Sequence, residues 1–442
     1  MSDPTTSREL WGGETRKAID NFPVSGEPIP ASVARWLGRI KGAAAHVNAE
    51  LGLLDAAKAE RIGAAADQIA RGELDDQFPI DVFQTGSGTS SNMNANEVIA
   101  TLAGEGVHPN DDVNMGQSSN DVFPSAVHLA ALDELVNDLI PSLTVLAVSL
   151  EAKAVEFDDV VKSGRTHWMD AVPVTLGQEF GGYAAQVREG IARVESTLGR
   201  LGKIPLGGTA VGTGLNTHPE FAAKVRARLA ADTGLTISAP ADAFESQAAR
   251  DGLVETSGAL KTVAVSLTKI ANDLRFLGSG PRAGLSEIFL PELQKGSSIM
   301  PGKVNPVIPE VVTQVAAQVI GNDTAIAIGG MQGHFELNVF IPLMARNLLD
   351  SITLLSSSSR MFAEKCIDGI EANREQCETY AELTLSAATA LNPYIGYDAA
   401  AEIVKEASHS KRSLREVARE KGVSDEVLDK ALDFRAMAKP HG

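Results

Sequence analysis

Apolar residues recur every three to four positions along five long stretches of the chain, which is the spacing that buries one face of an α-helix. The stretches cover about 120–157, 174–201, 243–277, the residues after Pro309, and 337–370. In the first stretch, Val127, Ala131 and Leu135 keep the helical spacing after Asn120. Pro141 is expected to kink this helix or end a first segment of it, because proline lacks the backbone N–H that a helix interior uses.

Few strand patterns interrupt these stretches, so we expect a mainly α fold with the long helices in a bundle. Helices that are apolar on more than one face are usually buried on more than one face. A single five-helix bundle would leave some of those faces in water, so we expect association between copies of the chain. Shorter helical pieces before the bundle and charged amphipathic patterns after it complete a three-domain prediction, with boundaries at 1–118, 119–372 and 373–442.

Composition narrows the functional classes. The chain has 442 residues, of which 44% are hydrophobic and 22% charged, so a large core is available. Its formal net charge of −18 argues against non-specific binding to nucleic acid or anionic membrane. An anionic substrate would therefore need local donors, because the overall field repels it. The sequence contains no stretch of eighteen apolar residues and no apolar core near its start, so we expect neither a membrane span nor a signal peptide.

The two cysteines, Cys366 and Cys377, are ten residues apart and have no neighbouring histidine cluster. This spacing opposes a metal site or a disulfide framework and favours reduced thiols in a cytoplasmic protein. We therefore expect neither a metal nor another cofactor.

The segment Gly296–Pro306, with the sequence GSSIMPGKVNP, carries the strongest chemical signal. Its glycines permit close approach or hinge motion, and its prolines stiffen the backbone between and after them. Two serines, a lysine and an asparagine on such a loop could place a base beside a cation and an amide donor, which suits chemistry on a carboxylate. A surface loop with routine turn residues is the alternative.

Three further polar clusters stand out. The first, residues 85–94, combines glycines, hydroxyls and amides before a predicted helix, so it could cradle an anion or simply cap that helix. The second, residues 108–121, is rich in Asn, Ser and Asp and could be capping alone. The third, residues 164–171, holds His167 on a short link between two long helices, where a histidine is either a proton-transfer group or structural.

Taken together, and in this order, the clusters resemble the fumarase/aspartase superfamily, whose signature segment matches Gly296–Pro306. The resemblance runs from about Trp11 into the C-terminal domain. Further matching segments are Thr85–Thr89, Ser118–Asp121, Gly164–His167, Gly207–Gly214 and His334–Val339. Within the superfamily, two positions resemble the class II fumarases more than the aspartases. Aspartases tend to carry Ala where this chain has Gly302, and Ser-Thr where it has Ser118–Ser119.

The resemblance implies a fumarase/aspartase-like three-domain fold that forms a homotetramer with a twenty-helix core and active sites built from three subunits. It implies the reversible trans hydration of fumarate to (S)-malate through an aci-carboxylate intermediate, a step of the tricarboxylic acid cycle. Ser297 would be the base, Lys303 and Asn305 would hold the carboxylate that gains charge, and His167 with Glu310 would bind the water. Glu310 also suits a helix start on its own. The implied substrate contacts are Ser87, Gly88, Thr89, Ser118, Ser119, Asn120, Thr166, Ser298, Lys303, Val304 and Asn305.

A second dicarboxylate site is implied at His108, Pro109, Asn110 and Asp111, although His108 could equally be a surface turn residue. Gly116 and Trp168 depart from the family pattern, in which Ser and a smaller apolar residue, respectively, are common.

Three other functions remain open: an ammonia-lyase with the same intermediate, a catalytically silent structural homologue, and a nucleotide-binding module. The acidic charge and the missing βαβ pattern oppose the last of these.

Overall fold

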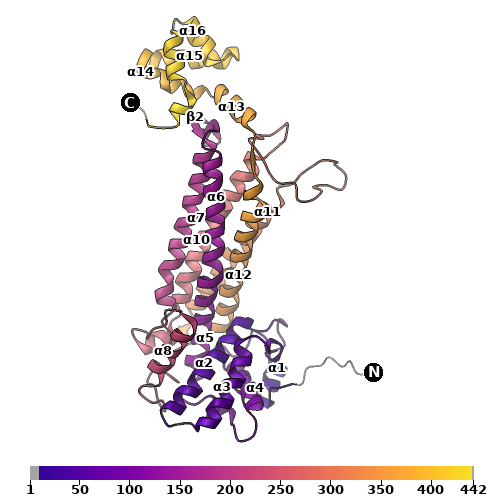
Figure 1. Cartoon of the computed structure of the whole chain (residues 1–442), viewed down its shortest axis with the longest axis vertical. Coiled ribbons are helices and arrows are strands. Elements are labelled where there is room, and N and C mark those ends of the chain that lie inside the picture. The colour runs from indigo at the N-terminus through magenta and orange to yellow at the C-terminus, as the bar shows by residue number, and fades with distance from the viewer. Residues whose placement is uncertain (1–8, 441–442) are drawn as a thin grey trace. The chain divides into compact units, whose positions relative to one another are not determined.

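The computed structural model describes residues 9–440 and is mainly helical (Figure 1). Residues 1–8 and 441–442, at the outer ends of the predicted first and third domains, lie outside the described part. The helices up to the middle of the chain are α1 (Gly13–Asn21), α2 (Ala31–Glu50), α3 (Ala56–Ala70), α4 (Thr89–Ala103), α5 (Ser119–Glu134), α6 (Ile140–Glu156), α7 (Leu176–Leu201) and α8 (Phe221–Thr233). The later ones are α9 (Ala243–Ala248), α10 (Asp251–Leu277), α11 (Val307–Gly330), α12 (Ile341–Lys365), α13 (Arg374–Leu383), α14 (Asn392–Ile395), α15 (Tyr397–Ser410), α16 (Leu414–Glu420), α17 (Asp425–Ala431) and α18 (Phe434–Met437).

Strands form three antiparallel pairs. These pairs are β1 (Val161–Thr166) with β2 (Met169–Thr175), β3 (Ile288–Phe289) with β6 (Glu371–Ala372), and β4 (Gly333–His334) with β5 (Leu337–Asn338). Only the first pair is longer than two residues per strand within residues 9–440.

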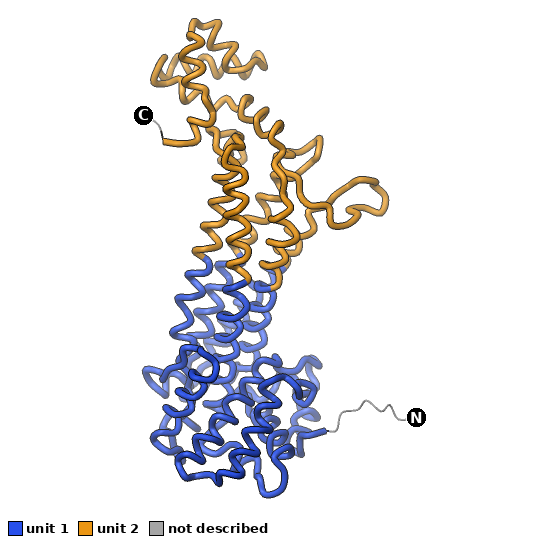
Figure 2. The backbone as a smooth tube through the Cα atoms, viewed as in Figure 1, with its two compact units in different colours: residues 1–141, 190–264, 315–356 blue, residues 142–189, 265–314, 357–442 orange. Residues whose placement is uncertain are grey.

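The chain folds into two compact units, coloured separately in Figure 2. Unit 1 holds the residues up to 141 together with 190–264 and 315–356, and unit 2 holds 142–189, 265–314 and the residues from 357 onward. The long helices α7, α10, α11 and α12 each contribute one part to unit 1 and the other part to unit 2.

In unit 1, α2 packs closely against α3 because α2 carries glycines on the contact face. A Cβ atom on Gly38 would lie 2.8 Å from the carbonyl oxygen of Ala66, so a larger residue would push the helices apart. The side chains of Trp36 and Ile40 are buried beside this contact. The Asp55 carboxylate caps α3 by accepting the N–H of Lys58, which fixes where the helix begins.

The long helices are cross-linked by buried polar contacts inside each unit. In unit 1, Ser257 of α10 donates to Asp323 of α11 (2.8 Å). In unit 2, Tyr183 of α7 donates to Asp273 of α10 (3.0 Å). Such contacts fix the register of one helix against the next, because each partner loses its water on burial.

The predicted helical stretches are present, but several of their boundaries were wrong. In the first stretch α5 ends at Glu134, and a π-helical turn, Leu135–Leu139, leads into α6, so Pro141 itself ends no segment. The alternative, a kink at this proline, stays a prediction. The third breaks at Ala249–Arg250, between α9 and α10. The first residues of the second and fifth stretches belong to strands β2 and β5 instead of helices. Helix α7 therefore begins at Leu176, and α12 begins at Ile341.

The C-terminal part of unit 2 has a small core of its own. Leu391, Ile403, Leu414, Val417 and Leu428 bring buried side chains to it from α15, α16, α17 and the turn before α14. Ser413 and Ser424 cap α16 and α17, so the short helices begin at defined residues.

Two helical stretches, Ser119–Glu156 and Val307–Gly330, are long and apolar enough to cross a membrane by length and composition alone. Core helices of bundles pass the same test. Their most apolar windows are only 39% and 33% buried within the chain, and Val311 and Ile328 of α11 are exposed. These helices therefore carry apolar faces that the single chain leaves uncovered.

Candidate active site

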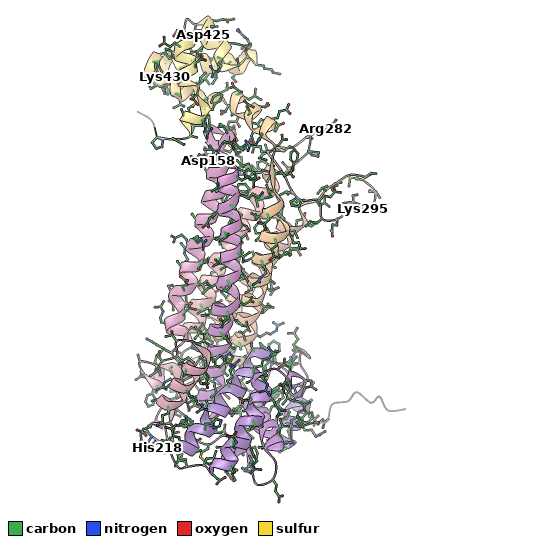
Figure 3. The ribbon with its side chains drawn as sticks, viewed as in Figure 1. Asp158, His218, Arg282, Lys295, Asp425 and Lys430 are labelled. Carbon is green, nitrogen blue, oxygen red and sulfur yellow. The ribbon has the colours of Figure 1, made fainter. Side chains whose placement is uncertain are left out.

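The signature segment Gly296–Pro306 is a closed loop in unit 2 whose two ends are held together by hydrogen bonds. Gly296 donates its N–H to the carbonyl of Lys303 (2.9 Å), and the Asn305 amide donates to the carbonyl of Gly296 (2.5 Å). A Cβ atom on Gly296 would lie 2.1 Å from the Lys303 carbonyl oxygen, so only glycine fits there. Figure 3 labels Lys295, which directly precedes the loop, and Arg282, on the same connection between α10 and α11.

Within the loop, the Ser297 hydroxyl oxygen accepts two backbone N–H groups, from Ile299 (3.2 Å) and Met300 (2.9 Å). Donors that converge on an oxygen stabilise negative charge on it. The ammonium group of Lys303 forms no ion pair within residues 9–440, so its charge is available to a ligand. The loop therefore has the groups needed to favour an ionised hydroxyl and to hold an anion.

A cavity of about 910 Å³ in unit 2 lies against this loop. Lys303 and Asn305 of the loop, Glu310 in the first turn of α11, and the ring of Trp168 all line it. Val304 lines it as well, so the structure brings four of the predicted site residues to one cavity. Ser297 and Ser298 are not among its lining residues.

His167 lies on the short link between α6 and α7, as predicted, and this link is the β1–β2 hairpin with His167 at its tip. His167 and Trp168 form a two-residue turn in which both have positive φ, 56° and 65°. Tight hairpins need this geometry, but glycine and asparagine usually supply it, so the turn holds two large side chains in a strained conformation. Both side chains, like that of Thr166, are exposed.

Charged residues anchor the base of this hairpin. The Arg165 guanidinium donates two hydrogen bonds to the fully buried Glu287 carboxylate (2.8 and 3.0 Å), and the buried Lys162 contacts Glu179 (2.8 Å) and Glu287 (3.4 Å). Burial raises the pKa of the Glu179 carboxyl, and the neighbouring Lys162 ammonium opposes that rise. Bidentate pairs of this kind hold a fixed geometry, so they position the strand that ends at His167.

A second cavity, of about 300 Å³, lies beside His167 and is lined by Lys162, Arg165, Glu179 and Tyr183. Trp168 and Phe276 line both cavities, and their rings form an edge-to-face pair with centroids 4.5 Å apart. His167 and Glu310 make no hydrogen bond to each other within residues 9–440.

In unit 1, the predicted donors Ser87, Gly88 and Thr89 form the start of α4. Gly88 is the N-cap with a left-handed backbone (φ 76°), and the hydroxyls of Ser87 and Thr89 are 2.8 Å apart. The first N–H groups of a helix have no partner inside the helix, so together with these hydroxyls they can receive an anion.

The predicted donors Ser118, Ser119 and Asn120 form the start of α5. Ser118 caps this helix in a reciprocal capping box with Asp121. The buried Asp121 carboxylate also accepts the N–H groups of Gly207 (3.0 Å) and Thr209 (2.9 Å), which ties the glycine-rich segment after α7 to the helix start.

The two helix starts in unit 1 lie side by side. Asn92 of α4 donates to the Ser119 hydroxyl (3.0 Å), and the backbone of Gly88 packs on the Phe123 ring of α5. Two clusters that are about thirty residues apart in sequence thus form one surface with hydroxyl, amide and free N–H donors. Such a surface can hold a carboxylate.

Gly86→Ala should lower kcat/KM for the dicarboxylate substrate proposed below by about 10²-fold, the typical cost of a misplacement near 1 Å. A Cβ atom at Gly86 would lie 1.7 Å from the carbonyl oxygen of Val339, so the loop that carries Ser87 and Thr89 must move. The matched control is Gly199→Ala in α7, where a Cβ atom meets no other atom within 4 Å. Equal kcat/KM in both variants would contradict the proposed role of this loop.

The predicted second site, His108–Asp111, lies at a tight turn in unit 1. The Nδ1 atom of His108 accepts the N–H of Asp111 (3.1 Å), and the nearby Asp112 carboxylate is paired with Lys58 (3.0 Å). Pro109 and Asn110 begin the same π-helical turn. These contacts account for the turn itself, and its negative charges do not favour a dianion.

Sequence reasoning missed several residues that support the site. Arg165 and Glu287 are 122 residues apart, so no local pattern joins them. The capping role of Asp121 could have been found from its spacing to Ser118. Within residues 9–440 no group of three or more His, Cys, Asp or Glu side chains could hold a metal ion, and Cys366 and Cys377 are buried free thiols.

Comparisons with known proteins agree across nearly the whole chain. A family profile described as lyase matches residues 4–321, and one described as fumarase C C-terminus matches residues 388–439. The chain is 59% identical to fumarate hydratase class II of Mycobacterium tuberculosis (strain ATCC 25618 / H37Rv), over 98% of this chain and 93% of that protein. Its structure is similar to a class II fumarase from Schistosoma mansoni, with a TM-score of 0.96 and 38% identity over 99% of this chain and 97% of that one. A fumarate lyase:delta crystallin from Brucella melitensis gives a TM-score of 0.90 and 46% identity, over 97% of this chain and 96% of that one.

Proposed function

Because this chain belongs to the class II fumarate hydratase family, and so adds water reversibly to fumarate to give malate, we propose that the segment Gly296–Pro306 carries the base of that reaction. The observation that supports this most directly is the pair of backbone N–H groups on the Ser297 oxygen. Free serine is far too weak an acid to act as a base near neutral pH. The two N–H groups, with the Lys303 ammonium on the same loop, favour its ionised form.

In the dehydration direction, Ser297 takes the proton from the malate carbon that lies next to a carboxylate. The electron pair moves into that carboxylate and gives the aci-carboxylate dianion, whose added charge Lys303 and Asn305 hold. Fixed donors aimed at developing charge are each worth about 3–4 kcal/mol. His167, assisted by Glu310, then gives a proton to the departing hydroxyl. The C–O bond breaks and water leaves, while the electron pair held on the aci-carboxylate returns to form the C=C bond of fumarate. Hydration runs through the same steps in reverse.

The remaining contacts hold the substrate's carboxylates. Ser87, Gly88 and Thr89 at the start of α4, and Ser118, Ser119 and Asn120 at the start of α5, supply neutral donors from unit 1. Thr166, Ser298 and Val304 supply the contacts from unit 2. Neutral donors fit the strongly acidic chain, because binding a dianion there needs local hydrogen bonds.

We also propose that the active site is completed by neighbouring chains of a homotetramer. The apolar side chains that one chain leaves exposed on α6 (Val148, Val155) and on α11 (Val311, Ile328) support this assembly. His167 and Glu310 would then form their pair across a subunit boundary, since each is exposed in the single chain.

Sedimentation velocity at micromolar concentration should give a single species near four times the mass of the 46.5 kDa chain. The physical reason is the cost of leaving apolar helix faces in water, about 25 cal/mol for each Å². A stable monomer with full activity would contradict both the assembly and the shared site.

The domain boundaries at 118 and 372 remain predictions, and the C-terminal family match over 388–439 falls inside the third domain. A cytoplasmic location is supported by the two buried free thiols. The second dicarboxylate site at His108–Asp111 remains a prediction that the surrounding carboxylates disfavour.

Purified protein should remove the ultraviolet absorbance of fumarate and produce malate. The same preparation should release no ammonia from aspartate, because none of the proposed substrate contacts is a carboxylate that could hold the ammonium group of aspartate. Ammonia release without fumarate hydration would overturn the proposed chemistry and favour an ammonia-lyase.

A further inference from the structure

Lys41 is a buried cation that the reaction described above does not use. It lies in the middle of α2, its side chain has no exposed area, and it forms no ion pair within residues 9–440. Its ammonium donates to two neutral acceptors, Asn114 Oδ1 (3.3 Å) and Gln117 Oε1 (3.2 Å). A buried charge without a carboxylate partner in contact is costly, so its place in the fold needs an explanation.

The acceptors of Lys41 belong to the turn that leads into α5. Asn114 donates its amide to the Gln117 carbonyl (3.3 Å), and Gln117 directly precedes the N-cap residue Ser118. The Asn92 amide of α4 donates both to Asn114 Oδ1 (3.2 Å) and to the Ser119 hydroxyl (3.0 Å). Lys41 is therefore linked to Ser119 through Asn114 and Asn92. Because the Ser119 oxygen already accepts from Asn92, its own proton can be donated outward.

We propose that Lys41 is a positioning residue for the substrate: its buried charge attracts the carboxylate held at the start of α5, and its hydrogen bonds orient the donors there. The inference rests on the proposed assignment of Ser118, Ser119 and Asn120 to substrate binding. Lys41 does not touch the substrate. It acts through Gln117 and through the link to Ser119. Its positive charge adds to that of the N-terminal end of the α5 dipole, which also attracts a carboxylate.

Burial gives Lys41 a charge that changes near neutral pH. Desolvation lowers the pKa of Lys41 to about 7, against the attraction of the Asp121 carboxylate on α5. Desolvation likewise raises the pKa of Asp121 to about 6, although three backbone N–H groups and Lys41 favour its ionised form. A dicarboxylate bound nearby favours the protonated lysine. Proton uptake by Lys41 and substrate binding are therefore coupled.

The other charged groups on the elements packed against α2 have their own partners. Asp133 of α5 accepts the Trp36 indole N–H, and Asp112 in the turn before α5 pairs with Lys58. Burial raises the pKa of Glu134, at the end of α5, to about 7, and its partners there are Ser32 and Arg35.

Asp121 is the charged group on α5 that acts on Lys41, and α4 contributes the neutral Asn92. Beside this part of α2, α3 presents Ala66 and Ile69. The Lys224–Glu50 pair, which joins α8 to the end of α2, is largely exposed and already neutralised. A change in dicarboxylate affinity near pH 7 that depends on Lys41 can therefore be assigned to this network.

Lys41→Met tests the proposal, because methionine keeps much of the side-chain length without the charge. The probes are the KM and kcat of fumarate and the Ki of succinate, a dicarboxylate that cannot be dehydrated. At about pH 6, below the pKa of Lys41, we expect KM and Ki to rise about tenfold or more, while kcat changes less than about threefold. At about pH 8.5 wild-type Lys41 is mostly neutral, so the difference between the proteins should shrink.

Two further variants separate the possible outcomes. Lys153→Met removes another buried ammonium, one that contacts Glu156 and the Ile370 carbonyl in unit 2, and should leave KM and Ki unchanged. Ser119→Ala tests the underlying site: if it leaves KM unchanged, the substrate assignment of this helix start is wrong. The inference about Lys41 is wrong in two cases in which Ser119→Ala does raise KM. In the first, Lys41→Met leaves KM unchanged. In the second, Lys41→Met raises KM equally at both pH values.

If Lys41→Met does not fold, the pH dependence of the Ki of succinate for the wild-type enzyme still tests the proposal. The Ki of succinate should rise as pH increases from about 6 to about 8.5, through the pKa of Lys41. A Ki that is constant over this range would overturn the proposal without any substitution.

Discussion

Ser297→Ala should lower kcat by about 10³-fold or more and change KM only modestly. Two backbone N–H groups donate to the Ser297 oxygen and favour its ionised form. Alanine removes this proton acceptor but leaves the hydrogen bonds of Gly296 and Asn305, which close the loop, in place. Substrate binding depends mainly on other donors, so the loss should fall on the chemical step. Steady-state kinetics in both directions measure it.

The Ki of succinate is the control for the Ser297 variant. It should stay within about threefold of the wild-type value, which shows that the binding surface is intact. Near-normal turnover would remove Ser297 from the mechanism. A large rise in Ki with an unchanged kcat would instead make Ser297 a binding residue.

His167→Asn should lower kcat by about 10²–10⁴-fold, the usual contribution of a positioned acid or base. Asparagine tolerates the positive φ of the hairpin tip, so the turn should survive and the loss can be assigned to the imidazole. The limb of the pH profile that reports the imidazole should disappear. An unchanged pH profile would argue against a proton-transfer role.

Glu310→Gln extends this test to the proposed pair. If Glu310 acts by orienting and charging His167, the double variant should lose little more activity than His167→Asn alone. Fully additive losses would mean that the two residues act independently, and the shared water site would then be wrong.

The sequence revealed the chemistry more fully than the local structure that supports it. Gly296–Pro306 could be recognised because its functional groups are consecutive, and the structure brings its Lys303 and Asn305 to one cavity with Glu310. The hairpin at His167 was missed, since β1 is held by the buried Lys162 and by Arg165 rather than by alternating apolar residues. Its charge partner Glu287 is distant in sequence.

Helix positions followed from apolar spacing, but their ends depended on contacts that spacing does not encode. Pro141 ends no helix, because the π-helical turn before it accommodates the missing N–H. The sequence does not single out Lys41, because a lysine in an amphipathic helix is normally exposed, and only packing against the turn before α5 buries it.

The central claim is that Ser297 on the Gly296–Pro306 loop acts on a carboxylate held by donors from the two helix starts. A crystal structure of the assembled enzyme with a bound dicarboxylate inhibitor tests this most directly. We expect inhibitor oxygens within about 3 Å of Lys303 and Asn305 of one chain and of Ser119 and Asn120 of a neighbouring chain. An inhibitor bound away from residues 297–305 would contradict it.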